Sequence, residues 1–192
     1  MQSRNRRCDS MAKTVAIGVQ SFDKLIEENY FYIDKTSFIK EWWESGDDVT
    51  LITRPRRFGK TLNMSMLEQF FSLDYADRGD LFEGLSIWHE EKYRELQGTY
   101  PVISLSFARV KEDNYISTRE KICQIIRNIY IKNIFLKESD VLTDADRQYF
   151  DRILSVDVSN SDITSSIYQL SDYLSRYYGK KVIILLDEYD TP

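Results

Sequence analysis

The sequence has little histidine, cysteine, glycine or proline, and each shortage excludes a class of protein. A single His among 192 residues gives no basis for a His-rich metal site or for a Ser-His-Asp hydrolase. Seven Gly and three Pro are too few for a collagen-like chain or a flexible linker. The two cysteines, Cys8 and Cys123, lie far apart and outside any C-x-x-C pair, which favours a reduced protein of the cytoplasm.

Long apolar runs and an excess of basic charge are also missing. Because no run of about 18 apolar residues occurs, we expect no transmembrane helix and no membrane partner. The 26 basic and 31 acidic residues give a formal net charge of -5, which carries no global signature of nucleic-acid binding. At 42% apolar residues, the chain is too hydrophobic to be disordered. The composition therefore predicts a globular domain, which we place at residues 14–192.

The first 13 residues differ in character from the rest. Residues 1–11 contain three arginines and no apolar stretch. A secretory signal peptide needs about 7–15 consecutive apolar residues, so none is expected here. We interpret residues 1–13 as a disordered basic tail, or as the product of a misassigned start with Met11 as the true first residue.

Apolar side chains recur at helical spacing in six stretches, which predicts six helices. These stretches lie at residues 22–29, 35–45, 61–73, 122–129, 149–154 and 163–177. Asp34 is the expected N-cap of the second helix, because its carboxylate can accept a hydrogen bond from the first helical turn. Gly46 and Gly179 are expected to end the second and the last helix, since glycine readily adopts the left-handed conformation found there.

Three short runs rich in β-branched and apolar residues predict buried strands at residues 49–53, 102–107 and 182–186. Their alternation with helices is typical of an α/β fold in which helices cover a parallel sheet.

The tripeptide Gly59-Lys60-Thr61 lies between a predicted strand and a predicted helix, where a phosphate-binding loop would be found. The glycine lets backbone N–H groups approach phosphates, and the helix directs its positive end toward them. In such a loop Lys60 reaches the β- and γ-phosphates, and the Thr61 hydroxyl binds Mg²⁺. The general pattern has a glycine at position 54, where this chain has Arg54, so the loop must leave its strand differently. The alternative is a helix start that binds no phosphate.

Two acidic residues follow the last apolar run. An acid at the carboxyl end of a buried strand commonly holds Mg²⁺ opposite the phosphate-loop threonine, which predicts this role for Asp187. The adjoining Glu188 is placed to polarise an attacking water as a general base.

From residue 17 onward the chain resembles the AAA-ATPase-like domain family of bacterial and archaeal proteins. The matching motifs are YIDKT at 32–36, LITRPRRFGKTL at 51–62, YPVISLSF at 100–107 and VIILLDEYDTP at 182–192. The resemblance implies a P-loop NTPase fold, with three α/β/α layers around a mostly parallel sheet, and it implies ATP and Mg²⁺ as cofactors.

The same resemblance, joined to the motif chemistry, gives the predicted site. Catalysis is assigned to Lys60 and Glu188, and Mg²⁺ to Thr61 and Asp187. The residues assigned to nucleotide binding are Arg56, Arg57, Phe58, Gly59, Lys60, Thr61 and Leu62.

Two features of the sequence allow more than one interpretation, the arginines before Gly59 and the tripeptide at residues 34–36. Arg56 and Arg57 could contact phosphates of the nucleotide or of a nucleic acid, or could belong to a solvated basic loop. The tripeptide Asp34-Lys35-Thr36 could lie near the adenine or ribose, or could be a plain helix cap.

By the same resemblance, a central strand follows the acidic strand in sequence, whereas this chain reaches Pro192 five residues after Asp187. We therefore expect a domain truncated after its acidic strand, with a gap in the sheet and exposed apolar edges. Relatives often carry a C-terminal PD-(D/E)XK nuclease-like domain, through which a nucleic acid could be a partner, and a homo-oligomer is a further option.

The function that these features predict is ATP binding and hydrolysis, with the domain acting as a switch or motor for an appended module. ATPase activity is expected of the full-length protein rather than of this chain alone. The alternatives are a non-catalytic nucleotide-sensing or assembly module and a nucleic-acid-binding accessory domain.

Overall fold

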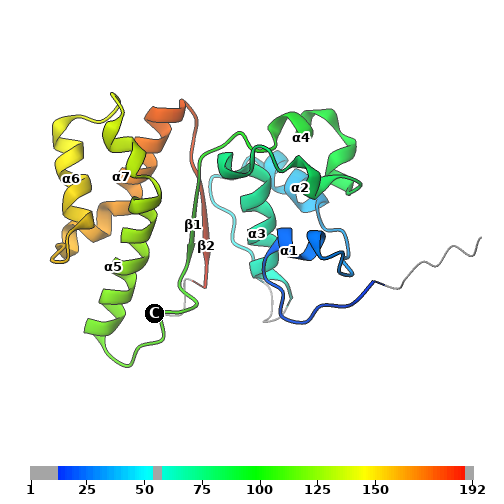
Figure 1. The fold of residues 1–192 in the computed structure, drawn as a ribbon, viewed down its shortest axis with the longest axis horizontal. Helices are drawn as coiled ribbons and strands as arrows, with labels where there is room; N and C mark the ends of the chain where they lie inside the picture. Colours follow the sequence, from blue (N-terminus) through cyan, green and yellow to red (C-terminus); the bar gives the residue numbers. More distant parts are fainter. Residues whose placement is uncertain (1–12, 54–57, 189–192) are drawn as a thin grey trace, which may run out of the picture.

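A two-stranded sheet stands between two groups of helices in the computed structural model (Figure 1). The structure describes residues 13–53 and 58–188. Helices α1 to α4 lie on one side of the sheet and α5 to α7 on the other (Figure 1).

The elements follow one another along the chain with these bounds. The α-helices are α1 (Phe22–Glu27), α2 (Ser37–Ser45), α3 (Lys60–Phe71), α4 (Glu91–Leu96), α5 (Tyr115–Lys132), α6 (Asp144–Leu154) and α7 (Asn160–Tyr178). Four short 3-10 helices are η1 (Leu73–Tyr75), η2 (Gly79–Phe82), η3 (Ser86–His89) and η4 (Ile134–Glu138). The strands are β1 (Val102–Ser106) and β2 (Ile183–Asp187).

The two strands pair in parallel, with Val102 opposite Ile183 and Ser106 opposite Asp187. Parallel strands need a long crossover connection, and here the helices α5, α6 and α7 provide it. The predicted strands at 102–107 and 182–186 are therefore confirmed, each to within a residue of its expected ends.

Each face of the sheet covers its own hydrophobic core. Ile103 and Leu105 of β1 pack into the cluster formed by α5, α6 and α7, whereas Ile183 and Leu185 of β2 pack into the cluster around α3. The buried side chains of β1 thus belong to one core and those of β2 to the other, which is possible because successive side chains of a strand point to opposite faces of the sheet. The sheet is thus the wall that the two cores share.

Helix ends agree with the local sequence. Thr143 and Asp146 form a reciprocal capping box at the start of α6, which satisfies backbone N–H groups in the first turn. Gly46 and Gly179 adopt the left-handed conformation at the ends of α2 and α7, as predicted. Asp34 is not the N-cap of α2, because the helix begins after Thr36. Its carboxylate instead accepts a hydrogen bond from the Thr36 N–H before the helix starts.

The predicted strand at residues 49–53 is not formed. Val49 is 87% exposed and Leu51 is 63% exposed, and within the described ranges this segment makes no ladder with β1 or β2. A strand needs a neighbour to satisfy its backbone groups, and in the described part of the chain β2 pairs with β1 alone. The described residues thus establish a mixed α/β fold with a small parallel sheet, and the larger three-layer sheet stays a prediction.

Candidate functional site

The start of α3 is the turn that the sequence predicts for a phosphate loop. Gly59 is the N-cap residue, with φ of +76°, a left-handed conformation that favours glycine. Its carbonyl accepts the first helical hydrogen bond, from Asn63 N–H at 2.9 Å. Among residues 13–53 and 58–188, no side chain caps this end of α3, and a helix start without such a cap can present its first N–H groups to an anion.

The acidic end of β2 meets this turn directly. The Thr61 hydroxyl donates a hydrogen bond of 2.8 Å to Asp187 Oδ2, joining residues 126 positions apart in the chain. Asp187 Oδ1 accepts a bond of 3.1 Å from the backbone N–H of Glu188. Both carboxylate oxygens are therefore held, and the side chain of Asp187 is fixed against the first turn of α3.

Glu188 has a left-handed backbone, with φ of +54°. This conformation is uncommon for a residue that is not glycine and costs about 1 kcal/mol or more. The half-buried Glu188 lines a groove that Lys60 and Asp187 also line.

Packing beneath the site fixes α3 in place. Met66, Leu67, Phe70 and Phe71 are buried on α3 in the cluster that also includes Ile183 and Leu185. The N–H of Phe22 donates a hydrogen bond of 3.0 Å to Ser65 Oγ on the same helix. Because one core contains both α3 and β2, the positions of Thr61 and Asp187 are set by burial rather than by their own hydrogen bond.

The predicted site residues divide into three groups. Lys60, Thr61, Asp187 and Glu188 are brought together around the amino end of α3 and the carboxyl end of β2. Phe58 is 59% exposed, and Leu62 packs against the core around α3, so neither side chain joins them. Gly59 is the N-cap of α3 and belongs with the first group, whereas Arg56 and Arg57 lie outside the described residues, as does Arg54.

The motif YIDKT has a structural role in this arrangement. The Asp34 carboxylate accepts hydrogen bonds from the N–H and hydroxyl of both Thr36 and Ser86, which tie the start of α2 to η3. The buried Thr36 hydroxyl accepts a further bond of 3.1 Å from Ile87 N–H. Burial alone would raise the pKa of Asp34, but the bonds from Ser86 and Thr36 outweigh it and hold the pKa below its ordinary value.

The donor atoms at the site suit Mg²⁺. A hydroxyl and a carboxylate are hard oxygen ligands, and Mg²⁺ is usually held by one or two protein groups together with substrate phosphates and water. Within the described ranges, no group of three or more His, Cys, Asp or Glu side chains could enclose a metal by itself. Thr61 and Asp187 therefore fit a cation that arrives with a phosphorylated ligand.

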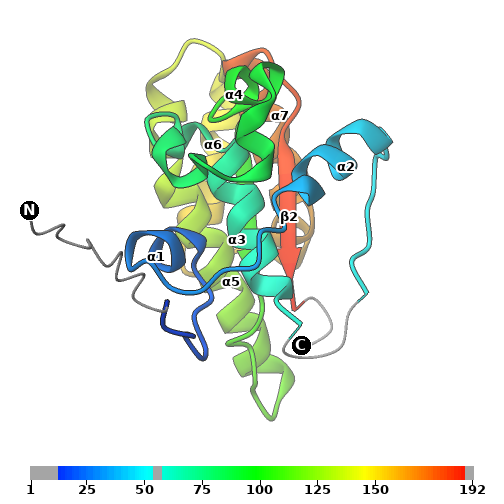
Figure 2. The same cartoon turned by 90° about the vertical axis from the view of Figure 1, so that its right-hand side faces the viewer.

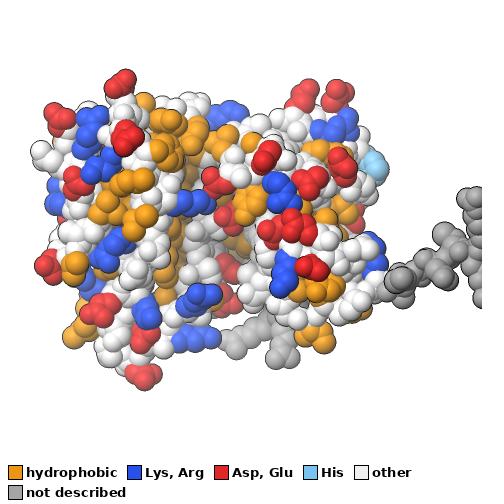
Figure 3. Space-filling model, viewed as in Figure 1, with side chains coloured by type: hydrophobic (Ala, Val, Ile, Leu, Met, Phe, Trp, Pro, Cys, Tyr) orange, Lys and Arg blue, Asp and Glu red, His pale blue; other side chains and the backbone are white. Residues whose placement is uncertain are grey.

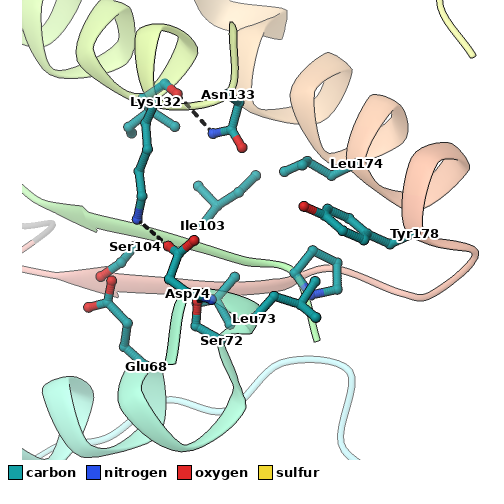
Figure 4. Close-up of a pocket in the computed structure, with 13 residues that line it drawn as sticks. Glu68, Ser72, Leu73, Asp74, Ile103, Ser104, Lys132, Asn133, Leu174 and Tyr178 are labelled. Carbon is teal, nitrogen blue, oxygen red and sulfur yellow. Dashed lines mark hydrogen bonds and ion pairs between the residues drawn. The ribbon is translucent and has the colours of Figure 1, made fainter. Parts of the chain in front are cut away.

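Another hollow lies toward the amino end of β1 and holds no part of this constellation. It measures about 60 Å³ and is lined by Pro101 and Ile103. Figure 4 shows Lys132 of α5 directed at Asp74, with a distance of 2.6 Å between the charged groups. The ion pair spans the two helical layers, since Lys132 belongs to α5 and Asp74 to η1.

The family comparison agrees with this geometry. A family model described as predicted AAA-ATPase matches residues 16–192. The chain belongs to this predicted AAA-ATPase family. The resemblance found in the sequence motifs is thereby confirmed over nearly the whole domain.

A curated relative extends the comparison. The chain is 28% identical over 181 residues to an uncharacterised protein encoded in the region 5′ of vnfD in Azotobacter chroococcum mcd 1. The alignment covers 94% of this chain and 30% of that protein, so the chain spans less than a third of its relative's length. No solved structure matches.

Among the helices of the described residues, none has the length and apolar character needed to cross a bilayer.

Proposed function

We propose that this domain of the predicted AAA-ATPase family binds ATP with Mg²⁺ and hydrolyses it, as a switch or motor for a module attached to it. The observation that supports this is the hydrogen bond between Thr61 and Asp187, the two predicted metal ligands, across the junction of α3 and β2. One basic, one hydroxyl and two acidic side chains, those of Lys60, Thr61, Asp187 and Glu188, lie around this contact at the amino end of α3.

Each residue has a defined task in this proposal. The backbone N–H groups after Gly59 cradle the phosphates, and Lys60 neutralises charge on the β- and γ-phosphates. Thr61 and Asp187 hold Mg²⁺, which when bound supplies charge neutralisation for phosphoryl transfer. Glu188 orients a water molecule and accepts a proton from it.

Thermal unfolding with ATP and Mg²⁺ tests the binding step. A ligand that binds only the folded state stabilises it, by about 2.7 kcal/mol at a concentration of 100 times Kd. Lys60→Ala should remove most of this stabilisation, whereas Lys24→Ala, an exposed lysine on α1, should keep it. Equal stabilisation of the two variants would contradict the assignment of Lys60.

Glu188→Gln tests hydrolysis separately. The amide keeps the size of the side chain but cannot accept the proton, so the variant should bind ATP as before and lose turnover. If parent and variant both bind ATP and neither releases phosphate, the domain is a nucleotide-sensing or assembly module.

Nucleic-acid binding by this domain has less support. On the face drawn in Figure 3, basic and acidic side chains are interspersed, with no large patch of one sign. Phosphate backbones are bound by clustered basic charge. The roles of Arg56 and Arg57 stay predictions, which salt-dependent DNA binding by Arg56→Ala would test.

A further inference from the structure

Four apolar side chains form a cluster on the surface where η4 meets the end of α7. They are Ile134, Phe135, Tyr177 and Tyr178, each between 36% and 46% exposed. The ring centroids of Phe135 and Tyr177 are 5.2 Å apart, and those of Tyr177 and Tyr178 are 4.8 Å apart. Figure 3 shows apolar side chains gathered over this end of α7, which Figure 1 places next to the start of β2. We call these four residues the aromatic patch.

Other side chains anchor the elements that carry the aromatic patch. Leu136 of η4 and Leu174 of α7 are buried in the cluster formed by α5, α6 and α7. A single exposed aromatic ring is common on a folded protein, whereas contiguous apolar side chains on the surface are typical of an interaction site. The aromatic patch is therefore a candidate docking surface.

The segments that carry the patch are basic. Residues 131–137 and 176–181 contain five basic side chains and no acidic one, although the whole chain has a net charge of -5. Three of the five form ion pairs, which are Lys132 with Asp74, Lys137 with Asp151, and Arg176 with Asp146 and Asp172. The other two are Lys180 and Lys181, which are exposed and follow Tyr178 after one glycine.

Lys180 and Lys181 carry charge that no acidic side chain balances. Within residues 13–53 and 58–188, neither lysine forms an ion pair with Asp or Glu. The Lys180 ammonium donates a hydrogen bond of 3.0 Å to the carbonyl of Thr99 and lies 4.9 Å from the centre of the Tyr100 ring. These contacts hold Lys180 in place and leave its charge unneutralised. The docking surface thus has an apolar centre and a positive rim.

We propose that the aromatic patch, with Lys180 and Lys181 at its rim, docks an acidic amphipathic segment of a partner protein. The apolar face of the segment covers the four patch residues and removes them from water. Its carboxylates lie against the two lysines, which selects the partner by charge and sets the direction of the segment.

The chain's own segments outside the described ranges do not suit this surface. Residues 1–12 contain three arginines and one acid, and residues 54–57 contain three arginines, so both have the same sign of charge as the rim. Residues 189–192 follow the carboxyl end of β2 and span at most about 14 Å. The five residues of β2 alone are about 17 Å long, and the patch lies at the other end of this strand.

Two other classes of occupant are also disfavoured. A second copy docked about a two-fold axis would bring lysines against lysines, which costs free energy. A single-stranded nucleic acid stacks its bases on open aromatic faces and needs clustered basic charge. Here the rings of Phe135, Tyr177 and Tyr178 meet edge to face, with interplanar angles of 65° and 82°, and only two lysines are unbalanced. A polypeptide with apolar and acidic side chains fits better.

The docking surface and the candidate site lie at opposite ends of β2. Figure 2 shows β2 running down toward the start of α3, whereas α7 ends at the upper end of the strand. Lys180 and Lys181 precede β2 in the chain, and Asp187 is its last residue. Docking uses none of the residues assigned to ATP or Mg²⁺, so the inference does not depend on the proposed function. Peptide binding without nucleotide would support it even if the chain bound no ATP.

Peptide selection on the 192-residue chain tests the chemistry of the partner. The probe is a phage-displayed library of random peptides of about 16 residues, long enough for four helical turns, used without nucleotide. Peptides that bind the parent and are rejected by Tyr177→Ser should have apolar residues three or four positions apart and a negative net charge. The matched control is Tyr168→Ser, which changes a 75% exposed tyrosine about 14 Å away along the same helix and should keep binding.

Fluorescence anisotropy of the strongest selected peptide measures the two parts of the surface. Tyr177→Ser should weaken binding at least about tenfold, because a central aromatic side chain carries much of the affinity. Lys181→Glu should weaken binding about threefold at low salt and less at high salt, whereas Lys24→Glu on α1 should have no effect. If Tyr177→Ser does not fold, Ile134→Ser changes the patch from the other element and answers the same question.

Three results would overturn the proposal. The first is a selection in which no peptide distinguishes the parent from Tyr177→Ser, or in which the distinguishing peptides are basic. The second is binding of a labelled oligothymidylate that Tyr177→Ser abolishes, which assigns the patch to a single-stranded nucleic acid. The third is self-association in sedimentation velocity that Tyr177→Ser abolishes and Tyr168→Ser does not, which identifies a second copy as the occupant.

Discussion

Two parts of the molecule share one local sequence, a helix that ends at a glycine and is followed by an apolar run, but only one of these runs forms a strand. In the first, α2 ends at Gly46 and is followed by the apolar segment 49–53. In the second, α7 ends at Gly179 and is followed by β2. Both runs lead into the candidate site, yet only the second is a strand.

The difference comes from what lies beside each run. β2 has β1 as a neighbour along its whole length, and Ile183 and Leu185 are buried in the core. Segment 49–53 has no strand beside it among the described residues, and Val49 and Leu51 are exposed. A β-rich sequence is therefore not sufficient for a strand, because pairing and burial provide the stability.

The largest expected effect is a difference in stability between two variants, in which one leucine of β2 or one leucine of segment 49–53 is truncated to alanine. Leu185→Ala removes a side chain that is only 4% exposed and should cost about 2–5 kcal/mol of unfolding free energy. Leu51→Ala changes a side chain that is 63% exposed and should stay within about 0.5 kcal/mol. Urea unfolding of both variants measures the contrast, and equal losses would show that segment 49–53 is as well packed as β2.

The next effect concerns the anchor of α2, the helix that leads into segment 49–53. Asp34→Asn weakens the bonds from Thr36 and Ser86 and should cost about 1–2 kcal/mol at neutral pH. The folded-state pKa of Asp34 is lowered, so the stability from its charge is present above the ordinary pKa of about 3.9 and is lost as the pH falls through the folded value.

Unfolding of the parent and Asp34→Asn at a series of pH values measures this dependence. The gap between them should be constant from pH 7 to about 5 and should narrow below about pH 4. A gap that widens toward acid would mean that Asp34 is not held as a carboxylate.

The two helix-ending glycines should behave alike, because their effect is local. Gly46 has φ of +67° and Gly179 has φ of +64°, and at either position an added Cβ would meet no atom of the described residues within 4 Å. Alanine in this conformation should therefore cost about 1 kcal/mol in each variant. Thermal unfolding of Gly46→Ala and Gly179→Ala checks this, and a much larger loss at Gly179 would mean that the turn before β2 carries tertiary contacts as well.

The smallest expected effect is at the ion pair between Lys132 and Asp74 near the amino end of β1. The two side chains are 57% and 53% exposed, so the pair should contribute less than about 0.5 kcal/mol. A double-mutant cycle of Lys132→Met and Asp74→Asn at low and high salt measures it. A coupling above about 1 kcal/mol would show that charge, as well as packing against the common sheet, joins the two helical layers.

Local patterns in the sequence predicted much of the fold correctly. Helical spacing located six of the seven α-helices that the described residues form, and the apolar runs located β1 and β2. The region of residues 73–96, which forms η1, η2, η3 and α4, gave no such pattern. Its buried residues, among them Leu81, Phe82 and Ile87, pack from short turns whose spacing has no period.

Motifs in the sequence identified candidate site residues but did not show how these residues are arranged in space. Lys60, Thr61, Asp187 and Glu188 were each named from a motif, and the structure brings them together. The motif that contains Asp34 did not indicate which distant residue would form hydrogen bonds with its carboxylate. Its hydrogen bonds to Ser86 join residues 52 positions apart, which no local pattern encodes.

For this protein, the sequence by itself located six helices, the glycine ends of α2 and α7 and the β-rich runs, and it named the side chains that are predicted to bind phosphate and Mg²⁺. Only the tertiary structure decided that β2 becomes a strand while segment 49–53 does not, and that Thr61 meets Asp187. The physical reason is that helix hydrogen bonds close within four residues, whereas a strand and a bipartite site depend on partners distant in the chain.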